Sequence, residues 1–264
     1  MSAFPAYEIH VTRESVSRWL LGRDGHTGPP PADGVPVPLA YFVFLRMQPI
    51  LGVSVHALLG RDPDRGLLGG VTYRAERLPR VGECLRAQAA VTERKTVDGA
   101  RGKLTLTTLA NRYRNGKGTV LEEAVRMVDL PPGPSQPPAR GPHGAPRFPR
   151  LAELAPLTRV QIAWLTVETG DMNPLHLDPA YAKSRLYPEV VVPGTLIAAL
   201  AEREAVRALA APLAELDLRL HAPTYPGEAL AFHGGATSAG LEFEMLCGEE
   251  LRATGRARAA DAVS

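Results

Sequence analysis

Residues 195–210 have the sequence TLIAALAEREAVRALA, which begins directly after Pro193-Gly194. Leu196, Leu200 and further apolar residues recur at helical spacing, so the segment predicts a largely buried helix. Candidate strands with glycine-containing turns follow at Leu216–Ala222, Ala229–Ala236, Leu241–Cys247 and Leu251–Arg258. A long helix followed by successive antiparallel strands predicts the α+β class.

The N-terminal half shows the same order of elements. An apolar segment at Leu39–Leu51 predicts a helix, whose Tyr41–Phe44 region we expect to form an apolar pocket wall. Strands are predicted near Gly70–Glu76, Cys84–Arg94, Lys103–Arg114 and Val120–Asp129. The chain therefore contains two similar sets of elements.

A proline-rich stretch separates the two sets. Eight prolines fall within residues 131–149, which predicts a stiff, extended linker without packed structure. The predicted organisation is an N-terminal domain at 1–130, a linker at 131–149 and a C-terminal domain at 150–264.

The two halves also repeat each other at a shift of 145 positions. The shift places Trp19-Leu20 on Trp164-Leu165, Gly25 on Gly170, Pro29 on Pro174, Asp33 on Asp178, and Gly82-Glu83 on Gly227-Glu228. A period this long indicates a fused pair of domains rather than a solenoid.

One loop combines an acid and a base. Gly170-Asp171-Met172-Asn173-Pro174-Leu175-His176 follows an apolar segment at 160–165 that predicts a helix. Gly170 allows the chain to leave that helix, Pro174 restricts the backbone, and Asp178-Pro179 predicts the start of the next helix, Ala180–Ser184. Asp171 and His176 are therefore candidates for proton transfer.

The N-terminal copy lacks this pair. The same shift places His26 on Asp171, Gly28 on Asn173 and Pro31 on His176, and proline has no proton to move. We expect a catalytic C-terminal half and a degenerate N-terminal half.

The string Gly-Asp-x-Asn-Pro-Leu-His resembles the signature of the MaoC-like (R)-specific enoyl-CoA hydratases and 3-hydroxyacyl-thioester dehydratases. The resemblance continues through Val192–Leu196 and Leu218–Glu228. It implies a hotdog fold, here a double hotdog of two antiparallel sheets that each wrap a long helix. It also implies that the N-terminal half accommodates the substrate.

The resemblance further implies roles for single residues. Asp171 and His176 would be the catalytic dyad, and syn addition of water would give the (R)-3-hydroxyacyl thioester. Gly194 begins the long helix, so its N–H is suited to a developing oxyanion. This chain has Pro193 where the family usually has histidine, so the role of that histidine is not carried over.

Other residues receive structural interpretations. Asn173 is expected to support the loop that carries Asp171 through its side-chain amide. His56, His221 and His233 have no partner at metal-ligand spacing and are interpreted as structural. The sequence predicts no metal site and no cofactor, and it lacks the glycine-rich and nucleophile motifs of nucleotide hydrolysis, dinucleotide redox chemistry and serine hydrolysis.

Composition limits the partners and the location. The net charge of +2 gives no reason to expect nucleic acid or membrane as a partner. Cys84 and Cys247 do not form a paired motif, and we expect reduced thiols in a cytoplasmic protein without a signal peptide or membrane span.

The predicted function is reversible hydration of trans-2-enoyl thioesters, carried by CoA or an acyl-carrier protein. Two alternatives remain: an acyl-CoA thioesterase, and a non-catalytic subunit that binds acyl thioesters. Acyl chain length, the member of the dyad that protonates C2, and homodimer formation by the fused chain stay open.

Overall fold

The computed structural model describes residues 4–25, 27–61, 65–99, 102–131 and 144–260. The N-terminal half contributes strands β1 (Tyr7–His10), β2 (Gly66–Ala75), β3 (Cys84–Gly99), β4 (Gly102–Asn115) and β5 (Gly118–Asp129). The C-terminal half contributes β6 (Arg150–Leu154), β7 (Leu213–Leu220), β8 (Leu230–Thr237), β9 (Gly240–Cys247) and β10 (Glu250–Ala259). The eight predicted strands are all present, and β1 and β6 were not predicted.

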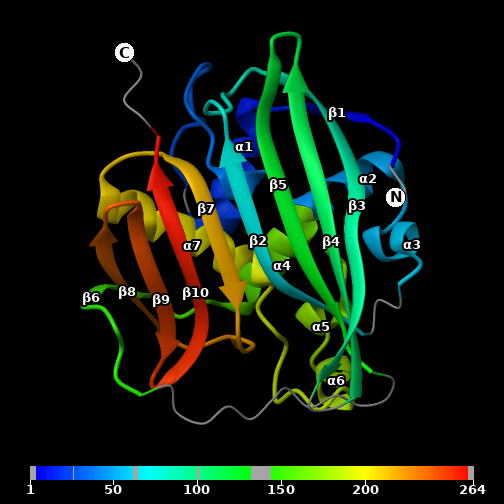
Figure 1. Cartoon of the computed structure of the whole chain (residues 1–264), viewed down its shortest axis with the longest axis vertical. Coiled ribbons are helices and arrows are strands. Elements are labelled where there is room, and N and C mark those ends of the chain that lie inside the picture. Colours follow the sequence, from blue (N-terminus) through cyan, green and yellow to red (C-terminus); the bar gives the residue numbers. More distant parts are fainter. Residues whose placement is uncertain (1–3, 26, 62–64, 100–101, 132–143, 261–264) are drawn as a thin grey trace.

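These strands form one antiparallel sheet in the order β1-β3-β4-β5-β2-β7-β10-β9-β8-β6 (Figure 1). The order of the second half mirrors that of the first about the β2–β7 pair, in which Val71 lies opposite Leu218. The α+β class is confirmed. The prediction of two separate sheets is corrected, because β2 and β7 pair edge to edge and join the half-sheets.

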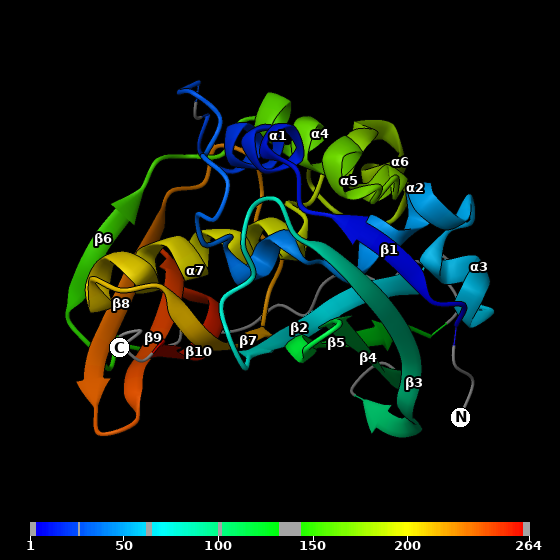
Figure 2. The same ribbon diagram turned by 90° about the horizontal axis from the view of Figure 1, so that it is seen from above.

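The long helix α7 (Gly194–Leu209) lies against the concave face of the sheet, which curves around it (Figure 2). Leu196, Ala198, Ala199 and Ala201 are fully or almost fully buried. The predicted buried helix is therefore confirmed, and its small side chains permit close packing against the strands.

Among the described residues of the N-terminal half there is no equivalent long helix, so the prediction over Leu39–Leu51 is wrong. This segment forms two 3₁₀ turns, η1 (Leu39–Tyr41) and η2 (Phe44–Arg46), and the short helix α2 (Met47–Leu51). The backbone N–H groups of this segment donate hydrogen bonds to glutamate side chains of other elements. Glu202 of α7 accepts from Leu39 and Ala40 at 2.6 and 2.8 Å, and Glu123 of β5 accepts from Phe44 at 3.0 Å.

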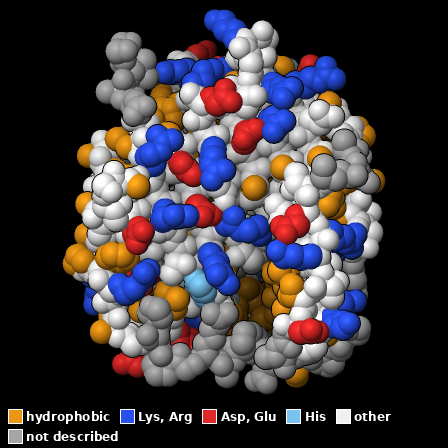
Figure 3. All heavy atoms as spheres, viewed as in Figure 1, with side chains coloured by type: hydrophobic (Ala, Val, Ile, Leu, Met, Phe, Trp, Pro, Cys, Tyr) orange, Lys and Arg blue, Asp and Glu red, His pale blue; other side chains and the backbone are white. Residues whose placement is uncertain are grey.

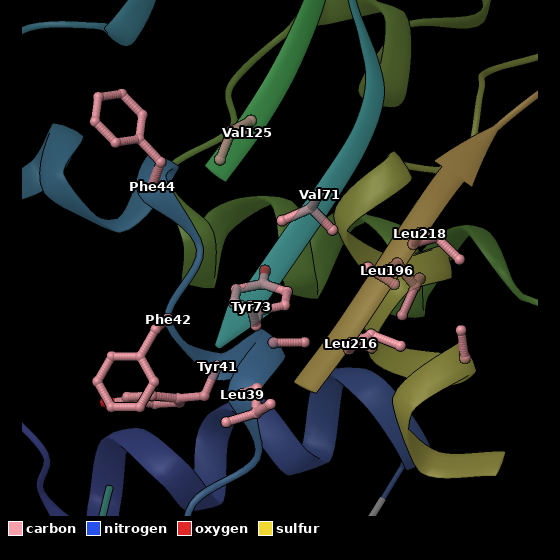
Figure 4. Packing of buried hydrophobic residues seen from close by; sticks show 14 of the residues in the cluster. Leu39, Tyr41, Phe42, Phe44, Val71, Tyr73, Val125, Leu196, Leu216 and Leu218 are labelled. Atoms are coloured by element: carbon pink, nitrogen blue, oxygen red, sulfur yellow. The ribbon is translucent and has the colours of Figure 1, made fainter. Parts of the chain in front are cut away.

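The aromatic residues of this segment belong to the core. Phe42 and Phe44 are 0% and 1% exposed, so they do not form the predicted pocket wall. The rings of Phe42 and Tyr113 lie 5.0 Å apart in an edge arrangement. Figure 4 shows Phe42 and Phe44 in the same cluster as Val71 of β2 and Leu218 of β7, so one core spans both halves.

Helices α1 (Arg13–Asp24) and α4 (Arg159–Thr169) pack on each other and have matching ends. Thr12 and Thr158 cap their first turns, and Gly25 and Gly170 end them with φ of 67° and 74°. The two helices therefore end alike at a shift of 145 residues, although α1 is one residue longer than α4. The predicted domain boundaries remain a prediction, and most of the linker (132–143) lies outside the described residues.

Both cysteines are free thiols; Cys84 is exposed and Cys247 is partly exposed. Within the described ranges, no helix is both long enough and apolar enough to span a membrane.

A buried carboxylate in the N-terminal half should make stability depend on pH. Burial raises the pKa of Glu123 to about 8, although hydrogen bonds from Tyr113 and Phe44 oppose this shift. An unfolded glutamate titrates near pH 4.3. Folding therefore loses stability through Glu123 as pH rises between these values. Glu123→Gln should remove the part of the stability loss that Glu123 causes. Urea unfolding of both proteins from pH 5 to 9 would measure the free energy of unfolding at each pH. Identical pH curves for both proteins would contradict the assignment.

Candidate active site

Asp171 is fixed directly after α4. Gly170 takes a left-handed conformation, and the Asp171 N–H donates to the Thr166 carbonyl at 3.0 Å. The carboxylate is buried, with the residue 9% exposed. The backbone of the helix end thus holds an acid in the protein interior.

His176 lies on a short helix, α5 (Pro174–Leu177), rather than on an open loop as predicted. Pro174 occupies the first turn, and the Asn173 side chain accepts a hydrogen bond from the Leu175 N–H at 3.0 Å. Asn173 therefore caps the helix that carries His176. The predicted next helix is α6 (Pro179–Ser184), which Asp178 caps through the N–H groups of Ala180 and Tyr181.

The structure brings the acid and the base together. His176 Nε2 lies 3.5 Å from Asp171 Oδ2, which is long for a direct hydrogen bond. His176 Nδ1 lies 2.7 Å from the Val191 carbonyl oxygen. Since a carbonyl can only accept, we assign a proton to Nδ1, and this contact orients Nε2 toward Asp171.

The two groups shift each other's pKa in opposite directions. Burial alone raises the pKa of Asp171, but the nearby charge of His176, with the charge of His56, brings it below its ordinary value. Burial alone lowers the pKa of His176, but Asp171 and the Val191 carbonyl bring it above its ordinary value. The contact therefore favours the carboxylate form of Asp171 and the imidazolium form of His176.

Gly194 is the first residue of α7, and Pro193 precedes it without a side-chain cap. A Cβ at Gly194 would lie 2.5 Å from Leu220 Cδ1 and 2.8 Å from Leu68 Cδ2, so the position requires glycine. The first N–H groups of a helix have no acceptor within it. Val191, whose carbonyl binds His176, lies three residues earlier, which links the dyad to this helix start.

The N-terminal half borders the site through β2. Leu67 packs against the cluster that contains Leu175 and Val191, and Leu68 lies against Gly194. The charge of His56, on α3 (Val55–Leu59), also contributes to lowering the pKa of Asp171. The interpretation of His56 as structural stays a prediction.

The structure shows no counterpart of the dyad at Pro31, whose carbonyl oxygen accepts from Arg13 Nε at 3.0 Å. His26, which the shift places on Asp171, lies outside the described residues. Among the residues that are described, one group of potential metal ligands lies within 4.8 Å: Glu8, His10 and Cys84. All three are exposed on β1 and β3, and none belongs to the dyad.

The mutual effect of the dyad can be measured without substrate. Asp171→Asn should lower the pKa of His176, because burial then acts without the opposing carboxylate charge. Histidine ring NMR signals followed between pH 4 and 9 would report the shift. Asn173→Ala is a suitable control, since it removes the cap and keeps both titrating groups. An unchanged His176 titration in Asp171→Asn would show that the two groups do not interact.

Comparison with known proteins agrees with this arrangement. Residues 145–248 match the family described as MaoC like domain. HtdX from Mycobacterium tuberculosis has a TM-score of 0.74 at 15% identity, covering 97% of this chain and 100% of that chain. A structure described as a MaoC-like dehydratase has a TM-score of 0.75 at 18% identity, covering 97% of this chain and 98% of that chain. No curated protein matches the sequence.

The double hotdog prediction is also confirmed. Rv0216 of Mycobacterium tuberculosis, described as having a double hotdog fold, matches with a TM-score of 0.53 at 15% identity, covering 98% of this chain and 96% of that chain. At these identities the structures show the fold alone. The resemblance seen in the sequence is confirmed: residues 145–248 match a MaoC like domain, and the chain has a double hotdog fold.

Proposed function

We propose that the protein catalyses the reversible hydration of trans-2-enoyl thioesters to (R)-3-hydroxyacyl thioesters. The observation that carries the proposal is the buried Asp171–His176 pair, with His176 oriented by the Val191 carbonyl, inside a MaoC-like domain. Hydration needs a base for water, an acid for C2 and a donor to the thioester oxygen. Asp171, His176 and the Gly194 N–H are the groups available for these tasks.

Because the pKa of Asp171 is lowered and that of His176 is raised, we assign the role of base to Asp171 and the role of acid to His176. The Asp171 carboxylate accepts a proton from water as its oxygen bonds to C3. The His176 imidazolium donates its Nε2 proton to C2, and the Gly194 N–H stabilises the negative charge on the thioester oxygen in between. A proton then passes from Asp171 to His176, which restores both groups. Asn173 acts by holding the helix that carries His176.

The acyl group would enter through an apolar opening. Figure 3 shows a hollow lined by hydrophobic side chains between the lower end of β7 and α5. Leu68 and Leu220, from β2 and β7, meet at Gly194 on the inner side of this region. We propose that the N-terminal half accommodates the acyl chain there, with CoA or an acyl-carrier protein holding the thioester. A cytoplasmic location fits the two free thiols.

The test follows the loss of enoyl-thioester absorbance with crotonyl-CoA and crotonyl-acyl-carrier protein. Asp171→Asn and His176→Gln should each lower kcat by about 10²- to 10⁴-fold, the usual contribution of a general acid or base. His10→Gln, at an exposed histidine of β1, should keep the native rate. Circular dichroism would establish that the variants fold.

Three outcomes separate the candidate functions. Hydration by the native protein with an (R)-3-hydroxy product supports the proposal. Release of free thiol without hydration would instead identify a thioesterase. Binding of acyl-CoA with neither reaction would identify a non-catalytic subunit, and a dyad variant with the native rate would refute the assigned residues.

A further inference from the structure

An exposed imidazole, a thiol and a carboxylate lie together at one edge of the sheet. Strand β1 pairs with β3, and the register places His10 directly opposite Cys84. Glu8 lies two residues before His10, so both side chains project from the same face of β1. Tyr7 and Ile9 alternate with them and are buried, which leaves the face with Glu8 and His10 exposed to solvent.

The ligand atoms of these three residues are close enough to share one metal ion. His10 Nε2 lies 4.0 Å from Cys84 Sγ and 4.0 Å from Glu8 Oε2. One ligand atom of each residue lies within 4.8 Å of the other two. A point between three such atoms is at most about 2.8 Å from each of them, and bonds to zinc are about 2.0–2.3 Å long. Because all three side chains are exposed, movements of less than about 1 Å would complete three bonds.

The chemistry of the three groups indicates which metal they would hold. Thiolate, imidazole and carboxylate are ligands of zinc, whereas magnesium and calcium take oxygen ligands. Three protein ligands leave one position of a tetrahedral zinc ion for water. Cys84 is a free thiol, so its sulfur can bind the ion once the thiol proton has passed to solvent.

One neighbouring cation acts against a metal at this place. The register places Arg86 opposite Glu8, and residues opposite each other in a strand pair share a face of the sheet. The Arg86 guanidinium therefore competes with a metal ion for the Glu8 carboxylate. Removing this competitor should tighten metal binding, whereas removing a ligand should weaken it.

We propose that Glu8, His10 and Cys84 form a zinc site that fastens β1 to β3. β1 has four residues and is the terminal strand of the sheet. Two ligands come from β1 and one from β3, so the ion joins the two strands in addition to their backbone hydrogen bonds. The site is separate from the Asp171–His176 dyad, and the proposal does not depend on the hydration reaction.

Co²⁺ serves as a spectroscopic probe for this site. The full chain is freed of metal with a chelator, kept reduced and titrated with Co²⁺. Native protein should develop the near-ultraviolet absorption of a cobalt–sulfur bond and the visible bands of four-coordinate cobalt, at one ion per chain. Cys84→Ser should abolish the cobalt–sulfur absorption. Cys247→Ser replaces the other free thiol and should retain it.

Competition of Zn²⁺ with the bound Co²⁺ gives the zinc affinity of each variant. Loss of even an outer partner of a metal ligand costs about 10- to 100-fold in metal affinity, so Glu8→Gln and His10→Gln should each weaken Zn²⁺ binding at least about tenfold. Arg86→Gln should strengthen it. These side chains are exposed, so the variants should fold like native protein.

Zn²⁺ should also raise the urea midpoint of native protein, because an ion that binds the folded state stabilises it. The rise should be lost in Cys84→Ser. Hydration of crotonyl-CoA should not change when a chelator is added, since the dyad lies elsewhere.

Three results would overturn the proposal. The first is a cobalt–sulfur absorption that is absent from native protein or survives Cys84→Ser. The second is a Zn²⁺ affinity that neither Glu8→Gln nor His10→Gln changes. The third is a urea midpoint that Zn²⁺ raises equally in native protein and Cys84→Ser.

Discussion

Strands β2 and β7 meet at a point where one of them must lack a side chain. A Cβ at Gly70 would lie 2.4 Å from the Leu218 carbonyl oxygen, so only glycine permits this approach. The pairing turns two five-stranded half-sheets into one sheet and places β2 beside the start of α7. The contact of Leu68 with Gly194 follows from it. The candidate site therefore borders the seam between the halves.

The strands and the long C-terminal helix were predictable because their signals are local. Alternating and helical spacing of apolar residues reports which face of an element is buried, whatever it packs against. The segment at 39–51 has the same apolar character but a different structure. Its N–H groups bind Glu202, more than 150 residues away, and Glu123. Hydrogen bonds to carboxyl groups of distant elements replace helical hydrogen bonds in this segment. A short window of sequence does not contain those partners.

The candidate site likewise combines local features, which the sequence predicts, with contacts to distant residues, which it does not. Asp171 and His176 lie five residues apart, and Gly170 and Pro174 restrict the backbone between them, so their proximity could be predicted from the sequence. The orientation of His176 could not, because it depends on a carbonyl at Val191. His56, whose charge helps to lower the pKa of Asp171, lies 115 positions before it and shares no motif with it.

The two halves keep the same order of strands although their sequences differ at the positions of the proposed dyad. At the end of α1, the position equivalent to the end of α4 is occupied by Asp24, whose carboxylate binds Arg203 of α7 at 2.8 Å. Arg203 also binds Glu204 at 2.6 Å. These ion pairs tie α1 to α7 and keep the pKa of Asp24 below its ordinary value, even though burial raises it. Asp24 is therefore held as an anion in a structural ion pair. The equivalent position in the C-terminal half is Thr169, two residues before Asp171. The shift instead places His26 on Asp171, so the N-terminal half lacks an acid at the position of the proposed catalytic carboxylate.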